Sequence, residues 1–171
     1  MSSEAKFEGL FRSATRSAVH LEMRDGYMAD DPSYVAWQDG RVLLDDPESE
    51  WWRALVRAAV ARGVDVRRAR VVSEPVSDYV RFEYDITEQH NIEAGEQVRW
   101  LPRRRATDLA LPGNDFWLFD GEVLLVNHFS GAGDWTDTER VTDPSVVKLC
   151  GSAFEAVWER AIPHKDYHPN A

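Results

Sequence analysis

Residues 115–129 read DFWLFDGEVLLVNHF, and this stretch decides the fold class. Two apolar runs, 115–119 and 122–129, flank the dipeptide Asp120-Gly121. Asp-Gly between two such runs is the strongest short-range signal for a β-hairpin, because both residues tolerate the positive φ angles of a tight turn. The sequence therefore predicts two adjacent antiparallel strands, and residues 135–141 can add a third strand to the same sheet.

Helices and strands alternate before the hairpin. Apolar residues recur at helical spacing over residues 4–16, and they alternate with polar ones over 18–24, where we expect a half-buried strand. Residues 64–72 and 97–101 are predicted as further strands. Residues 76–90 fit either a strand or a helix, and a proline just before them and a glycine just after them favour the helix.

Two helix starts carry an aspartate followed by proline. Asp46 and Asp143 can each accept hydrogen bonds from free backbone N–H groups, and proline suits the first helical position. The first of these helices is expected to end at Gly63. The last carries apolar residues every three or four positions and stops at Pro163, so it is predicted to be a long amphipathic core helix.

Together these elements predict a single domain of the α/β or α+β class, with one mixed β-sheet flanked by helices. The length of 171 residues suits one domain. We expect an ordered core over residues 7–163 and a frayed tail over 164–171. Residues 25–48, which are rich in turn signals, are expected to be the loosest internal segment.

Composition and charge exclude several protein classes. Hydrophobic residues make up 43% of the chain, which excludes a wholly disordered protein. The net charge of −10 argues against a general nucleic-acid coat and against adsorption to anionic membranes. No apolar run approaches the roughly 20 residues of a membrane helix, and we expect no signal peptide. Because the single Cys150 can form no disulfide within the chain, we expect a cytoplasmic protein.

The charged residues are unevenly distributed. Residues 22–50 contain nine acids and two bases, whereas residues 53–70 contain six arginines and one acid. A second basic cluster, residues 99–105, contains four arginines. Two interpretations stay open: either the acidic and basic stretches neutralise one another in the fold, or a basic face binds an anion or a partner.

No complete catalytic motif is present. The chain lacks a Walker loop, a G-x-G-x-x-G turn after a strand, an H-E-x-x-H helix, paired zinc-binding cysteines and a G-x-S-x-G elbow. Cys150 lies on the apolar face of the last helix and is predicted to be a core residue. We expect no metal and no cofactor. Ser73 and Glu74 follow a strand, where active-site residues often lie; alternatively, one of them caps the next helix.

Three segments carry a resemblance to a known family. They are VVSEPVSDY at 71–79, GEQVRWLPR at 95–103 and DFWLFD at 115–120. In this order they resemble an uncharacterised actinobacterial domain family, over about residues 7–164. Members of that family are often encoded near small helix-turn-helix regulators and their short acidic companion proteins. The resemblance therefore implies a regulatory role, with such a regulator as the candidate partner.

Residues 97–162 also resemble one half of the phospholipase-D-like superfamily. That superfamily carries His, one residue, Lys, four residues and then Asp on a strand leading into a turn; the His attacks phosphorus and the Lys neutralises phosphate oxygens. When its Asp is aligned with Asp120, the Lys position falls on Asp115 and the His position on Gly113. The resemblance implies a scaffold without the usual phosphodiesterase chemistry.

Two functions from different classes stay open. The first is a non-enzymatic regulatory or protein-interaction domain, acting with a helix-turn-helix regulator or a similar protein. The second is a binder of, or an enzyme acting on, a small phosphate- or carboxylate-bearing anion. The candidate pocket for that anion comprises Arg70, Ser73, Glu74, Tyr79, Arg81, Arg99, Arg103, Asp115, Asp120 and His128. Direct nucleic-acid binding is opposed by the net charge, no membrane partner is expected, and a homo-oligomer stays open.

Overall fold

A seven-stranded mixed sheet forms the centre of the computed structural model, which describes residues 3–43 and 45–170. The strand order is β6-β5-β4-β1-β2-β3-β7. The strands are β1 (Ser17–Glu22), β2 (Asp65–Val72), β3 (Gln97–Pro102), β4 (Phe116–Phe119), β5 (Val123–Phe129), β6 (Trp135–Val141) and β7 (Ile162–Pro163). β1, β2 and β3 are parallel neighbours, whereas β4, β5 and β6 form an antiparallel meander beside β1. The predicted class, one mixed sheet with flanking helices, is confirmed.

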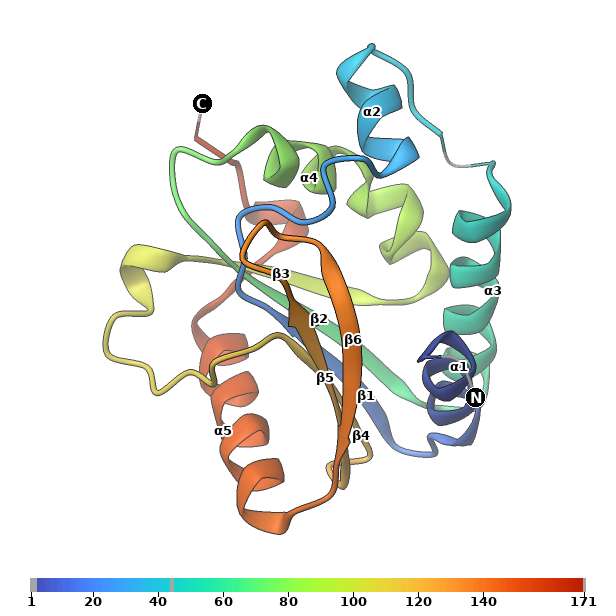
Figure 1. The fold of residues 1–171 in the computed structure, drawn as a ribbon, viewed down its shortest axis with the longest axis vertical. Coiled ribbons are helices and arrows are strands. Elements are labelled where there is room, and N and C mark those ends of the chain that lie inside the picture. The colour runs from blue at the N-terminus through green and yellow to red at the C-terminus, as the bar shows by residue number, and fades with distance from the viewer. Residues whose placement is uncertain (1–2, 44, 171) are drawn as a thin grey trace.

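Helices cover both faces of the sheet. They are α1 (Ser3–Ser13), α2 (Pro32–Gln38), α3 (Pro47–Ala61), α4 (Asp78–His90) and α5 (Pro144–Arg160). Figure 1 shows α5 on one side of the sheet and α1, α3 and α4 on the other. The side chains of Asp46 and Asp143 accept hydrogen bonds from the first backbone N–H groups of α3 and α5, as predicted.

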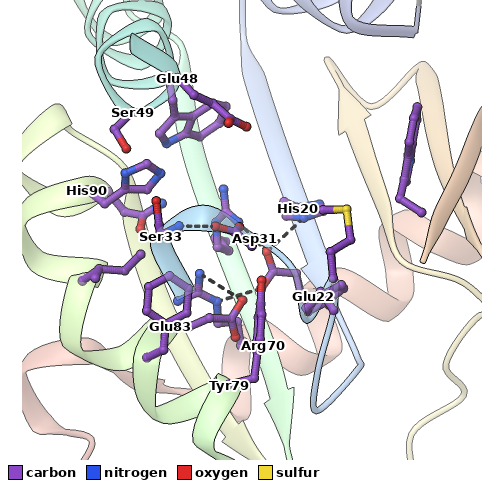
Figure 2. A pocket seen from close by; sticks show the side chains of 18 of the residues that line it. His20, Glu22, Asp31, Ser33, Glu48, Ser49, Arg70, Tyr79, Glu83 and His90 are labelled. Carbon is purple, nitrogen blue, oxygen red and sulfur yellow. Dashed lines mark hydrogen bonds and ion pairs between the residues drawn. The ribbon is translucent and has the colours of Figure 1, made fainter. Parts of the chain in front are cut away.

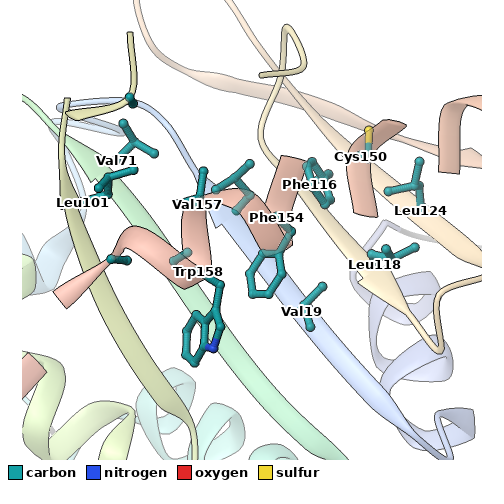
Figure 3. Close-up of a cluster of buried hydrophobic side chains, with 14 of the residues drawn as sticks. Val19, Val71, Leu101, Phe116, Leu118, Leu124, Cys150, Phe154, Val157 and Trp158 are labelled. Carbon is teal, nitrogen blue, oxygen red and sulfur yellow. The ribbon is translucent and has the colours of Figure 1, made fainter. Parts of the chain in front are cut away.

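Strand alternation divides the core between the two faces, because successive side chains point to opposite sides of a sheet. Phe116 and Leu118 of β4 pack towards α5, where they meet Phe154 and Val157 (Figure 3). The intervening Trp117 belongs to the other cluster, with side chains of α1 and α3. Both faces of the sheet are therefore buried, as in other α/β proteins with helices on each side.

The hairpin turn has the predicted geometry. Asp120 and Gly121 both have positive φ, 53° and 69°. The Asp120 carboxylate also accepts hydrogen bonds from the backbone N–H groups of Arg16 (2.7 Å) and Ser17 (2.9 Å). Asp120 thus joins the turn to the start of β1, which gives it a structural role at the end of the hairpin.

Residues 76–90 contain the predicted helix, α4. Its cap is Ser77, whose Oγ accepts a hydrogen bond from the backbone N–H of Val80 at 3.2 Å. The expectation that Ser73 or Glu74 caps this helix is wrong, because the Ser73 hydroxyl instead donates to the Asp25 carboxylate at 2.6 Å.

The C-terminal segment differs from the predicted frayed tail. α5 ends at Arg160, and β7 then pairs with β3. Tyr167 is only 2% exposed, and its ring stacks on Trp100 at 5.4 Å between centroids. The expectation of a tail from residue 164 is therefore wrong for residues 164–167, because the Tyr167 ring packs on Trp100 of β3. The expected loose segment, residues 25–48, likewise contains the short helix α2.

Candidate ligand pocket between the sheet and helices α3 and α4

A cavity of ≈ 360 Å³ lies on the sheet face that α3 and α4 cover (Figure 2). β1 and β2 form its floor, α3 and α4 contribute to its walls, and residues of the segment around α2 and of β5 complete it. This volume lies within the range of about 300–1,000 Å³ that is usual for small-molecule sites.

The floor of the cavity is polar because β1 and β2 alternate in phase. In the parallel register, His20 lies opposite Arg68 and Glu22 opposite Arg70. All four side chains therefore point to the same face, towards α3 and α4. His20, Glu22 and Arg70 are buried, with 5–6% of their surface exposed.

These charged groups are paired with one another. Arg68 Nη1 and Arg70 Nε both donate to the Glu22 carboxylate, the second at 2.7 Å. Arg68 Nε also donates to buried Glu96 at 2.6 Å, and Arg70 Nη1 donates to the Thr87 hydroxyl at 2.7 Å. Burial alone would raise the pKa of Glu22, but the two arginines hold that pKa well below its usual range. The acidic and basic stretches of the sequence thus neutralise one another in part.

His20 is held in place on three sides. Its Nδ1 lies 2.7 Å from the Phe116 carbonyl oxygen, so Nδ1 carries a proton and donates. Its Nε2 lies 3.1 Å from Glu22, and its ring stacks on Trp117 at 4.4 Å. The imidazole is therefore a fixed part of the wall.

Two further carboxylic acids in the wall have no arginine to themselves. Burial raises the pKa of Glu83 to about 8; its nearest guanidinium is that of Arg70, 3.8 Å away. Burial also raises the pKa of Asp115, which accepts hydrogen bonds from the Tyr27 hydroxyl and from the Met23 backbone N–H (2.9 Å). Both acids favour the neutral form more than an exposed carboxyl group does.

Of the ten residues predicted to form a pocket, three line this cavity: Arg70, Tyr79 and Asp115. Ser73, Glu74 and Arg103 line a separate depression beyond the ends of β2 and β3. The Arg103 guanidinium there donates to the Met23 and Val71 carbonyl groups, the second at 3.1 Å. This guanidinium is thus engaged in joining the ends of β1 and β2.

The other predicted residues lie elsewhere. Arg99 is on the opposite face, where its guanidinium lies 4.3 Å from the Trp158 ring centroid. His128 faces Glu139 on the outer strands at 3.1 Å, Asp120 joins the hairpin to β1, and Arg81 lines none of the described cavities. The ten residues therefore do not converge on one site.

His20, Glu22, Glu83 and His90 were missed from the sequence. The alternation of Ala18, His20 and Glu22 against apolar neighbours is typical of a solvent-facing strand side. A signal was nevertheless present, because Arg68 and Arg70 have the same spacing on the next strand with the opposite charge. Such complementary pairs can lie inside when helices cover them.

The comparison with protein families decides the family of this chain. Residues 5–169 match the family described as a domain of unknown function, DUF6879. The chain belongs to this family. A comparison of this DUF6879 domain with curated protein sequences finds no match.

Solved structures similar to this DUF6879 domain share its fold at low sequence identity. TrmBL2, an archaeal chromatin protein, is 17% identical with a TM-score of 0.50, over 93% of this chain and 49% of its own. Nuc from Salmonella typhimurium, a phospholipase D family member, is 13% identical with a TM-score of 0.51, over 94% and 89%. NucT from Helicobacter pylori is 8% identical with a TM-score of 0.54, over 94% and 90%.

At these identities the likeness concerns the fold alone. The DUF6879 domain has a phospholipase-D-like fold over nearly its whole length, which confirms and extends the resemblance of residues 97–162. It spans about half the length of the TrmBL2 chain.

The described residues lack two features that would point to other functions. No group of three or more His, Cys, Asp and Glu side chains there could hold a metal ion. In the same part of the chain, no helix has both the length and the apolar character that a bilayer crossing requires.

Proposed function

We propose that this domain is a non-enzymatic regulatory protein that binds a small molecule in the cavity between the sheet, α3 and α4. The observation that carries the proposal is the cavity itself: a ≈ 360 Å³ space, walled by paired charges and aromatic rings. The phospholipase-D-like resemblance of residues 97–162 implies that Gly113 and Asp115 stand where that motif has its His and Lys. We infer a scaffold that binds a ligand without that nucleophile.

The groups in and near the cavity support binding over catalysis. A phosphate would meet the carboxyl group of Asp115, where the motif needs a cation. Both ring nitrogens of His20 are engaged, Nδ1 with a carbonyl group and Nε2 with Glu22 at 3.1 Å. Cys150 lies in the core under α5, where burial raises the pKa of its thiol. None of these residues is set up as a nucleophile.

A protein partner is the second part of the proposal. The family resemblance implies a helix-turn-helix regulator. The outer strand β6 supports an interaction surface, because it lies at the edge of the sheet and has β5 as its one strand neighbour there. Trp135 at its start is 41% exposed and also lines the cavity. A ligand in the cavity can thereby be sensed at the edge of the sheet.

The alternative, an arginine-lined pocket for a small anion, is not favoured by any observation. Of the four arginines considered, Arg70 alone lines the cavity, and it is engaged with Glu22 and Thr87. Arg99 lies on the opposite face of the sheet.

The experiment compares the full chain with two matched variants. Ile86→Trp adds an indole inside the cavity, and Leu149→Trp adds one on α5, where Leu149 is 54% exposed. We expect a fraction of a metabolite extract to raise the melting temperature of the wild type and of Leu149→Trp, but not of Ile86→Trp. The same fraction should also change the affinity of the wild type for its helix-turn-helix partner.

Two results would overturn the proposal. One is that no fraction stabilises the wild type, or that all three proteins respond equally. The other is hydrolysis of bis(p-nitrophenyl) phosphate above the protein-free rate that His20→Ala or Asp115→Ala abolishes. Circular dichroism of each variant establishes that it is folded.

A further inference from the structure

We propose that the occupant of this cavity is a small organic cation, a protonated amine carried on an apolar group. This inference rests on the proposed function, since it names the chemistry of the ligand in the same cavity. Three independent features of the wall carry it: its charge balance, its aromatic rings and an unpaired buried acceptor.

Glu83 is the buried carboxylic acid of this group that lacks a close cation. Glu22 receives hydrogen bonds from Arg68 and Arg70 and lies 3.1 Å from His20 Nε2, and Glu96 receives one from Arg68. The guanidinium nearest to Glu83 is that of Arg70, which lies 3.8 Å away and already serves Glu22. A cation entering next to Glu83 would pair with its carboxyl group as that group ionises.

The remaining wall is also acidic. Among the described residues, six carboxylic acids and two arginines line the cavity. The acids are Glu22, Asp31, Asp46, Glu48, Glu83 and Asp115. Burial raises the pKa of the Tyr79 hydroxyl, and the charges of Glu83 and Asp31 raise it further. An anion would therefore be repelled, whereas a cation would be attracted.

Aromatic rings supply the second feature. Tyr79 and Phe82 of α4 line the cavity with Trp51 of α3 and Phe129 of β5. A cation over the face of such rings is attracted by their quadrupoles. The protein already uses this interaction: the guanidinium of Arg70 lies 4.8 Å from the Trp100 ring centroid. The same rings offer apolar surface to the rest of the ligand.

An unpaired acceptor is the third feature. Asn91 is 1% exposed and lines the cavity; its amide nitrogen donates to Glu96 at 2.6 Å, and its Oδ1 has no hydrogen-bond partner among the described residues. Nδ1 of the neighbouring His90 is likewise unpaired there, and burial lowers the pKa of this imidazole to about 4, so the ring is neutral. A buried acceptor without a donor destabilises the folded state, and a ligand bearing N–H groups can supply that donor.

The test uses three probes of one shape and different charge: phenethylamine, 2-phenylethanol and phenylacetate. We expect calorimetric titration of the full chain near neutral pH to show the amine binding at least about 10-fold more tightly than the alcohol, with no binding of phenylacetate. Because the carboxyl group of Glu83 would ionise beside the amine, titration in buffers of different ionisation enthalpy should show proton release.

The matched variants are Glu83→Gln in the wall and Glu93→Gln, an exposed glutamate after α4. Glu83→Gln should lose the preference for the amine and the proton release while still binding the alcohol, and Glu93→Gln should behave as the wild type. Equal or weaker binding of the amine relative to either other probe, or no binding of the amine, would overturn the inference. A metabolite fraction that still protects the wild type but not Ile86→Trp would then leave the proposed function standing.

Discussion

Glu83 lies on α4, where helical geometry points it at the sheet, and Arg70 of β2 reaches it from below. Glu83 is 8% exposed, and its carboxyl group lies 3.8 Å from a guanidinium that already serves Glu22. Burial acts first on its pKa; the charges of Arg70 and Arg68 lower it, and those of Glu22 and Asp115 raise it. The result, a pKa of about 8, makes this residue sensitive to pH in the neutral range.

This shift predicts a pH-dependent stability. Between its ordinary pKa of about 4.5 and about 8, Glu83 binds more protons in the folded than in the unfolded state. The contribution of Glu83 to the free energy of unfolding is therefore largest below pH about 4.5. It decreases as the pH rises above that value and is lost as the pH passes about 8. Urea unfolding of the wild type and Glu83→Gln across this window should show wild-type stability falling relative to the variant, by at most about 1.4 kcal/mol per pH unit. A constant difference between the two proteins would contradict this expectation.

At the scale of one element, α5 separates its residues sharply between core and surface. Phe154 is fully buried, and Cys150 in the same cluster is 4% exposed (Figure 3). Leu149 is 54% exposed. The helical period of 3.6 residues places these side chains on different faces. The apolar periodicity of residues 143–163 therefore identifies both the helix and its buried side.

We expect two truncations on α5 to differ strongly. Phe154→Ala should lower the free energy of unfolding by about 3–5 kcal/mol, because it removes a ring from the centre of the cluster and leaves a cavity. Leu149→Ala should change the same quantity by less than about 0.5 kcal/mol. Denaturant titrations of both variants give the comparison, and similar losses would show that α5 does not lie on the sheet as described.

For the whole molecule, the C-terminal segment closes the sheet next to α4. β7 extends the sheet beyond β3, and Tyr167 then stacks on Trp100. The Tyr84 hydroxyl donates to the Tyr167 carbonyl group at 3.0 Å, and the Tyr167 hydroxyl donates to Glu74 at 3.0 Å. These contacts join residues more than eighty positions apart, so the segment is part of the fold.

Shortening the chain tests this role. A chain ending at Pro163 should lose at least about 2 kcal/mol of unfolding free energy, since it lacks the buried Tyr167 ring. A chain ending at Tyr167 should stay within about 0.5 kcal/mol of the full protein, because His168 beyond it is exposed. Thermal and denaturant unfolding of the two chains decide the matter; equal stability of both would mean that the stack on Trp100 contributes nothing.

Local rules made much of the fold predictable. The turn at Asp120-Gly121, the caps at Asp46 and Asp143 and the periodicity of α5 depend on backbone angles and on spacing within a few residues. The same local reasoning failed for Tyr167, whose partner Trp100 lies far away in the chain. It also failed for most of the predicted pocket, because residue type alone does not say which arginines are already paired.

By itself, the sequence determined most of the elements and the class of the sheet, because these follow from local conformational preference and from spacing. Only the tertiary structure decided that His20, Glu22 and Arg70 lie inside. The polar side of a strand faces water until distant helices cover it, and α3 and α4 do so here. The cavity and its shortage of positive charge exist only once those segments meet.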